Sequence, residues 1–184
     1  MLKEKRTNGL LRYFSNEELN KLRNMKDLYS KSKILVVRLF EERVDKNGKP
    51  YINHLLRVSS KMTTRDGKVV ALLHDVVEDI EGVTFADLKD IGIPSHIIEA
   101  LKLVTKKETS KELTKKEKLE RYTQEIEHII KSKNRLAIEL KKNDMSDNFD
   151  IRRLNQLDEE KQEWFIQKYG NNVVKLRKVM VRYK

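Results

Sequence analysis

The stretch ALLHDVVEDI, residues 71–80, places four ionisable side chains among six apolar ones. On a helix that turns by about 100° per residue, His74, Glu78, Asp75 and Asp79 fall at about 0°, 40°, 100° and 140° and share one face. The apolar residues of the stretch fill the opposite face. The pattern predicts a helix over 67–80 that packs one side in a core and holds carboxylates and an imidazole on the other.

The polar face of this predicted helix contains no compensating cation, because no Lys or Arg occurs between Val69 and Gly82. A solvated face would usually carry a basic residue three or four positions from an acid, where it relieves the repulsion. An ordinary amphipathic surface helix is the alternative interpretation. The missing cation favours a divalent metal ion as the partner of the acids.

Further metal ligands would have to come from distant parts of the chain, which offers His54 and Asp144. His54 ends the segment DKNGKPYINH, residues 45–54, in which Asn47 and Gly48 favour a turn before a new helix. Asp144 continues an apolar helical stripe, where an unpaired carboxylate is costly. Because the chain has no cysteine, only nitrogen and oxygen ligands are available.

The composition predicts an all-α fold, a single bundle of about eight to ten helices. Glycine and proline number six and two, and no long stretch alternates apolar with polar residues as a strand does. We expect an N-terminal helical extension over 1–29 and one main domain over 30–184. The predicted helices cover 16–27, 29–43, 51–63, 67–80, 84–90, 95–104, 115–131, 133–147, 158–168 and 171–181.

The charge balance points to an anionic partner, since 40 basic residues stand against 29 acidic ones for a net charge of +11. The signs are mixed along the chain, as in residues 105–121, which is typical of solvated helix faces. The polar stretch 106–118 is expected to be an excursion that could act as a lid. The basic C-terminal segment has the apolar spacing of a final packing helix, which argues against a nucleic-acid partner. We expect a cytoplasmic protein, because neither a signal peptide nor a membrane span is recognisable.

Three motifs in order resemble those of a known superfamily: GKPYINH at 48–54, HD followed by VVED at 74–79, and NDMSDN at 143–148. Together they resemble the HD superfamily of metal-dependent phosphohydrolases. Within it, the sequence is similar to the hydrolase domain of RelA/SpoT-type proteins, which removes the 3′ pyrophosphate from (p)ppGpp, and to small stand-alone HD proteins. The similarity covers roughly residues 30 to 180.

The resemblance implies a function for specific residues of this chain. It implies a site for Mn²⁺, or for another divalent metal, with four ligands: His54, His74, Asp75 and Asp144. It implies that Glu78 and Asp79 activate and orient the attacking water. It places a nucleotide, such as a guanosine polyphosphate, near three further residues: Lys46, Lys49 and Asn148. The oligomeric state is not predicted.

The chain departs from the RelA/SpoT pattern at several positions. Leu55 stands where a proline usually follows the first histidine, and Met145 and Asp147 replace the arginine and histidine of the DRLHN motif. At these positions the chain is more similar to the small stand-alone HD proteins. Two alternatives therefore stay open: another HD nucleotidase or nucleoside-triphosphate hydrolase, and a module that binds nucleotide or nucleic acid without turnover. The presence of both Glu78 and Asp79 favours an enzyme.

Overall fold

The computed structural model describes residues 8–106 and 112–181. Over these residues all regular structure is helical, apart from an isolated bridge between Val44 and Pro50, so the predicted all-α fold is confirmed. The elements are η1 Gly9–Arg12, α1 Asn16–Asn24, α2 Leu28–Leu39, α3 Ile52–Ser60, α4 Arg65–Leu73, α5 Val76–Asp79, α6 Phe85–Asp90, α7 Ser95–Val104, α8 Lys115–Lys131, α9 Arg135–Asn148, α10 Ile151–Leu154 and α11 Glu159–Val181.

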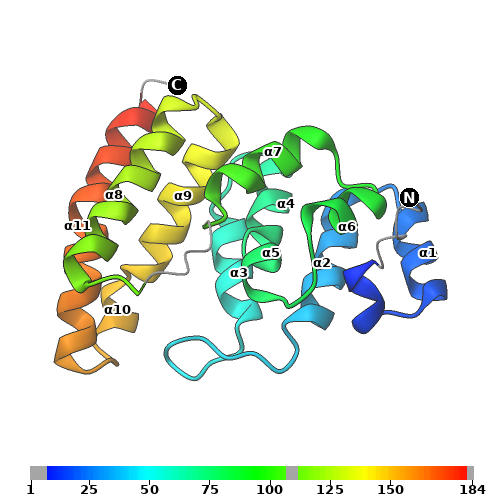
Figure 1. Cartoon of the computed structure of the whole chain (residues 1–184), viewed down its shortest axis with the longest axis horizontal. Helices are drawn as coiled ribbons and strands as arrows, with labels where there is room; N and C mark the ends of the chain where they lie inside the picture. Colours follow the sequence, from blue (N-terminus) through cyan, green and yellow to red (C-terminus); the bar gives the residue numbers. More distant parts are fainter. Residues whose placement is uncertain (1–7, 107–111, 182–184) are drawn as a thin grey trace.

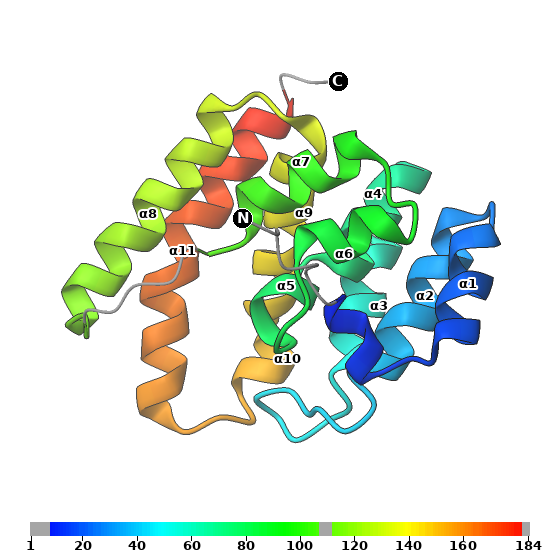
Figure 2. The same ribbon diagram turned by 45° about the vertical axis from the view of Figure 1, so that its right-hand side comes forward.

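The helices form two groups that meet along α9. Figure 1 shows α8, α9 and α11 side by side at one end of the molecule, and α1 beside α2 at the other end. Turning the molecule leaves both associations in place (Figure 2). Helix α9 packs against α3, α4, α7, α8 and α11, and α4 also packs against α2, α3 and α7. Side chains on α9 and at the end of α4 therefore lie where the two groups meet.

The prediction of one continuous helix over 67–80 is wrong. Helix α4 ends at Leu73, His74 and Asp75 form a turn, and the short α5 begins at Val76. The cause lies in the side chain of His74, whose Nδ1 lies 2.8 Å from the carbonyl oxygen of Ala71. In a continuous α-helix that oxygen would accept from the N–H of Asp75. The imidazole thus takes the place of a backbone donor where the helix is interrupted.

The two C-terminal helices predicted over 158–168 and 171–181 are one helix, α11. Gly170, which lies between the two predicted ranges, is inside this helix. Tyr169, Val173 and Leu176 are buried along one face of α11, which packs against α8 and α9. This burial outweighs the cost of an interior glycine, about 1 kcal/mol. Helices α2 and α3 end earlier than predicted, at Leu39 and Ser60.

The N-terminal segment shares its core with the rest of the described chain. Leu10, Phe14, Leu19 and Leu22 belong to the same buried hydrophobic cluster as the residues of α2, α4 and α9. The predicted boundary at residue 29 stays a prediction. Within the predicted lid at 106–118, residues 107–111 lie outside the described residues, and the stretch from Lys115 onward belongs to α8. Among the described helices, none has both the length and the apolar composition needed to cross a bilayer.

Candidate metal centre

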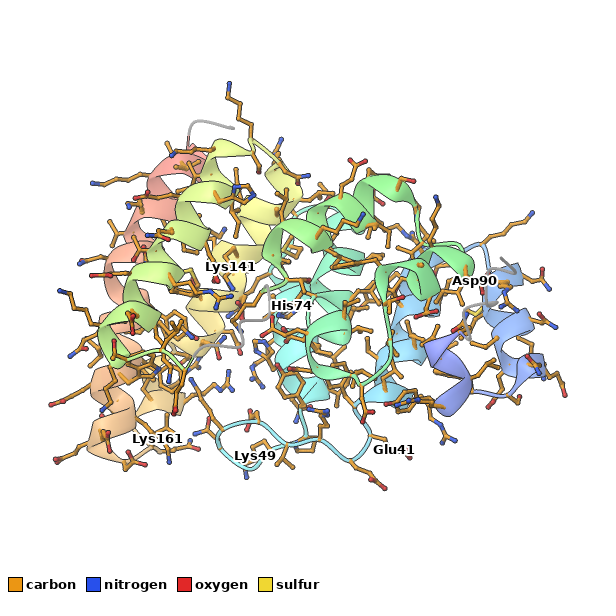
Figure 3. The ribbon with its side chains drawn as sticks, viewed as in Figure 1. Glu41, Lys49, His74, Asp90, Lys141 and Lys161 are labelled. Atoms are coloured by element: carbon orange, nitrogen blue, oxygen red, sulfur yellow. The ribbon has the colours of Figure 1, made fainter. Side chains whose placement is uncertain are left out.

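Four side chains predicted as metal ligands converge at the centre of the molecule. His54 comes from α3, His74 and Asp75 from the turn after α4, and Asp144 from α9. Figure 3 places His74 between the two groups of helices, with Lys141 of α9 close by in the same view. His54, His74 and Asp144 are buried. The fold therefore brings together residues that are 90 positions apart, between His54 and Asp144.

Three of the four predicted ligands offer atoms within reach of one ion, and Asp144 lies beside them. His54, His74 and Asp75 each offer one atom, and these three atoms all lie within 4.8 Å of one another. His74 Nε2 is 3.0 Å from Asp75 Oδ2, and His54 Nε2 is 3.5 Å from Asp144 Oδ1. His74 Nε2 is 3.9 Å from the same Asp144 oxygen. Both imidazoles thus direct Nε2 toward the carboxylates.

The second nitrogen of each imidazole is held outside the cluster. His74 Nδ1 lies 2.8 Å from the carbonyl oxygen of Ala71, and His54 Nδ1 lies 2.8 Å from Asp147 Oδ2. A carbonyl oxygen can only accept a hydrogen bond, so the proton of the His74 contact resides on Nδ1. In a neutral ring the Nε2 lone pair then faces the carboxylates. Lone pairs and carboxylate oxygens that face each other need a cation between them, so this donor set fits a divalent metal ion.

The protonation of the metal-free cluster shows the same demand for positive charge. Burial by itself lowers the pKa of His54, but the carboxylates of Asp144 and Asp147 outweigh it and raise the pKa to about 9. Burial raises the pKa of Asp75, yet the imidazole of His74 outweighs this and lowers it to about 2. The site therefore takes up positive charge on its nitrogens while its carboxyl groups stay ionised.

A cavity of about 220 Å³ opens over this cluster. Its acidic wall contains the four predicted ligands together with Tyr51, Glu78 and Asp79. Its other wall is basic and aromatic, with five side chains from α8, α9, α11 and the segment after α7: Lys106, Tyr122, Lys141, Lys168 and Tyr169. Lys141 Nζ lies 3.1 Å from Asp144 Oδ2. The cavity thus sets carboxylates and imidazoles against three lysines.

The predicted catalytic pair lines the cavity. The carboxylate of Glu78 accepts from Lys106, through its Nζ and, at 3.3 Å, through its backbone N–H. The backbone carbonyl of Asp79 accepts from Arg43. Burial, and then the negative charges of Asp75 and Glu78, raise the pKa of the Asp79 carboxyl group. Both residues therefore line the same cavity as the predicted ligands, and their carboxyl groups have different charged neighbours.

The three predicted substrate-binding residues lie in different places. Asn148 lines the cavity, and its Nδ2 donates to Asp144 Oδ1 at 2.7 Å. Lys46 Nζ lies 3.8 Å from the centre of the Phe165 ring and donates to the carbonyl oxygen of Asn148 at 2.7 Å. Lys49 is exposed and lines a separate hollow near Arg57 and Arg153. The structure thus brings Asn148 to the cluster but not Lys49.

Several residues at the site were not predicted from the sequence. Tyr51 donates from its hydroxyl to Asp75 Oδ2 at 2.6 Å, and it lies inside the quoted GKPYINH motif. Asp147 contacts His54. Because it follows Asp144 by three residues, helical spacing puts both aspartates on the same side of the helix. Lys168 and Tyr169 come from α11, far along the chain from every motif. No local pattern of the sequence indicates that α11 closes the cavity.

Among solved structures, the chain is similar to a metazoan ortholog of SpoT that hydrolyses ppGpp and plays a role in starvation responses. The two share 23% sequence identity with a TM-score of 0.62, and the alignment covers 86% of this chain and 97% of the other. No family model matches the chain, and no curated protein matches it. The likeness shows that the chain has the fold of this SpoT ortholog, so the predicted RelA/SpoT-like fold is confirmed.

Proposed function

We propose that the chain is an HD-type metal-dependent phosphohydrolase that acts on a nucleotide, with the 3′-pyrophosphate of (p)ppGpp as its first candidate substrate. The observation that carries the proposal is the convergence of two imidazole nitrogens and two carboxylates on one wall of a cavity that also contains Glu78 and Asp79. Such a set of nitrogen and oxygen donors suits Mn²⁺ and related divalent ions. His54, His74, Asp75 and Asp144 would hold the ion.

A divalent ion at this position would lower the pKa of a coordinated water and polarise a phosphoryl oxygen. The chain's own residues would supply the rest of the chemistry. Glu78 and Asp79 are carboxyl groups on the cavity wall, where one of them can accept a proton from the water and the other can orient it. Tyr51 donates to Asp75 Oδ2 and holds that carboxylate in one orientation.

The basic wall of the cavity supports an anionic substrate. Lys168 Nζ lies over the rings of Tyr122 and Tyr169, at 4.8 and 5.2 Å from their centres. Burial, and then the charges of Lys106 and Lys141, lower its pKa to about 8. Lysines gathered in this way repel each other, and a phosphate group between them would offset the repulsion. A substrate with several phosphates can reach both the lysines and the metal position.

The choice of ppGpp as first substrate rests on the fold. The SpoT ortholog of the same fold hydrolyses ppGpp, and this chain covers 97% of it. The replacement of the DRLHN motif by DMSDN at 144–148 leaves other nucleotides as alternatives. Mn²⁺ as the metal and a cytoplasmic location are part of the same proposal.

The test is chromatographic analysis of products after incubation with Mn²⁺ and a panel of ppGpp, pppGpp, nucleoside triphosphates and monophosphates. Metal-dependent release of pyrophosphate from ppGpp is expected, and it should disappear with a chelator and in His74→Ala. His96→Ala is the matched control, because His96 is an exposed histidine paired with Asp66 outside the cavity. If only another nucleotide is hydrolysed, the result supports a phosphohydrolase and contradicts ppGpp as its substrate. An intact panel would contradict the proposed enzyme.

A further inference from the structure

Asp147 makes the closest contact to His54 outside the predicted ligand set. Its Oδ2 lies 2.8 Å from His54 Nδ1, on the nitrogen that does not face the other ligands. Asp147 is 1% exposed, and it does not line the cavity. It stands at the position where the RelA/SpoT DRLHN motif has a histidine. A buried carboxylate at this place therefore requires its own explanation.

Asp147 is held in its ionised form by two arginines. Arg57 forms a two-pronged contact, with Nε 2.9 Å from Oδ1 and Nη2 3.1 Å from Oδ2, and Arg153 Nη1 also donates to Oδ2. An ionised carboxylate only accepts hydrogen bonds, so the proton of the contact resides on His54 Nδ1.

The arginines are themselves held by a second carboxylate. Arg153 Nη2 donates to Asp45 Oδ2 at 2.8 Å, and Arg57 Nη2 lies 3.9 Å from the same oxygen. The side chains of Asp45 and Asp147 are both almost fully buried. Among the described contacts, however, Asp45 has none to His54. The two aspartates thus share one arginine network but differ in whether they contact a predicted metal ligand.

We propose that Asp147 is a positioning residue that orients His54 for metal binding and keeps its Nε2 lone pair directed at the ion. The proposal rests on the proposed metal site. A carboxylate that accepts from the outer nitrogen of a ligating histidine fixes the ring and makes the inner nitrogen a stronger donor. The arginines from α3 and α10 keep Asp147 in the charged form that this requires.

The test measures Mn²⁺ binding by titration calorimetry, without any substrate. Asp147→Asn is expected to weaken Mn²⁺ binding by about 10- to 100-fold, the effect typical of such outer partners. Asp45→Asn is the matched control, because it removes one charge from the same arginine network and leaves His54 untouched. It is expected to bind Mn²⁺ within about threefold of the wild type. His74→Ala should abolish binding.

A second readout separates positioning from general stability. Co²⁺ bound at saturation has visible absorption bands that depend on its ligand field, so these bands should shift in Asp147→Asn and stay in place in Asp45→Asn. Circular dichroism shows whether each variant is folded. If Asp147→Asn does not fold, the charge-balanced Asp147→Asn/Arg57→Gln double variant takes its place, with Arg57→Gln alone as its control.

The outcomes separate this inference from the proposed function. Wild-type affinity in Asp147→Asn, or an equal loss in Asp45→Asn, would overturn the role of Asp147 while leaving the metal site intact. A wild-type chain that binds no Mn²⁺ or Co²⁺ would overturn both. Binding that depends on His74 and Asp147 but not on Asp45 supports the inference, whatever substrate the enzyme proves to hydrolyse.

Discussion

Glu78 and Asp79 are adjacent in sequence, yet their carboxyl groups meet different neighbours. The Glu78 carboxylate is paired with Lys106, while the carboxyl group of Asp79 is half-buried beside like charges. The local sequence VVED indicates that both acids belong together, but it does not indicate which of them has a cation. Lys106, which lies 28 residues further on, makes that difference.

The first prediction at the scale of the residue concerns Glu78. Glu78→Gln should keep Mn²⁺ binding and lower kcat by about 100-fold or more, because an amide cannot accept the proton of the attacking water. Steady-state kinetics together with calorimetry measure the two effects separately. Glu81→Gln is the control, since Glu81 is exposed and pairs with Arg12 away from the cavity. Unchanged turnover in Glu78→Gln would remove this residue from the mechanism.

The second prediction at this scale concerns Lys168. Lys168→Met keeps an apolar side chain over Tyr122 and Tyr169 but removes the charge. A hydrogen bond to a charged phosphate contributes about 1.5–3 kcal/mol, so KM for a polyphosphorylated nucleotide should rise by about tenfold or more.

Lys175→Met is the matched control for Lys168→Met. Lys175 lies on the same helix, α11, but it is exposed and pairs with Glu127. Its substitution should leave KM unchanged. Equal KM values for the two variants would show that Lys168 does not contact the substrate.

At the scale of the element, the interruption between α4 and α5 decides how the HD stretch presents its side chains. The sequence pattern placed His74, Glu78, Asp75 and Asp79 on one face of a regular helix, and all four do line the cavity. The prediction of one regular helix is wrong, because the His74 side chain contacts the carbonyl of Ala71 where the helix breaks. Hydrophobic periodicity predicts which side faces inward, whereas a side-chain bond to the backbone is invisible to it.

Helix α11 provides a prediction at the scale of the element. Gly170 lies inside the helix, and a Cβ added there would meet nothing within 4 Å. Gly170→Ala should therefore raise the free energy of unfolding by about 0.5–1 kcal/mol. Denaturation with urea measures the change.

The control for Gly170→Ala is the same substitution at Gly48. A Cβ there also meets nothing within 4 Å, but φ is +70°, which L side chains rarely adopt. Gly48→Ala should lower the free energy of unfolding by about 1 kcal/mol. The two glycines thus differ in backbone conformation rather than in space. A loss of stability in Gly170→Ala would show that α11 is not a regular helix at this position.

At the scale of the whole molecule, the candidate metal centre joins elements from both groups of helices. Its proposed ligands come from α3, from the turn after α4 and from α9, and α9 packs against helices of both groups. Without an ion, this junction gathers the carboxylates of Asp75 and Asp144 beside the imidazoles of His54 and His74 and the ammonium group of Lys141. Metal binding should therefore stabilise the fold as a whole.

The prediction at this scale is a thermal shift on metal binding. An ion present at 100 times its Kd stabilises the folded state by about 2.7 kcal/mol. For a chain of this size that corresponds to a rise in Tm of roughly 5–10 °C. Differential scanning calorimetry with and without Mn²⁺ measures it. His96→Ala should shift like the wild type and His74→Ala should not, and a shift retained in His74→Ala would place the bound ion elsewhere.

The sequence by itself determined the helical class, most helix positions and the acidic and histidine residues that meet at the cavity. The all-α prediction follows from composition and from apolar spacing at helical period, which local physics controls. The merging of 158–168 and 171–181 into α11 could not be predicted, because burial against α8 and α9 overrides the local cost of Gly170.

The tertiary structure alone decided how the site is supported. His54, His74, Asp75 and Asp144 stand out in the sequence because charged residues interrupt apolar patterns. Their surroundings do not stand out in the sequence: Asp147 with Arg57 and Arg153, Lys141, and Lys168 of α11. These contacts depend on how α9 packs against α3 and α4 and how α11 packs against α8 and α9. Local periodicity reports which face of a helix is buried, but long-range packing chooses which buried charges become neighbours.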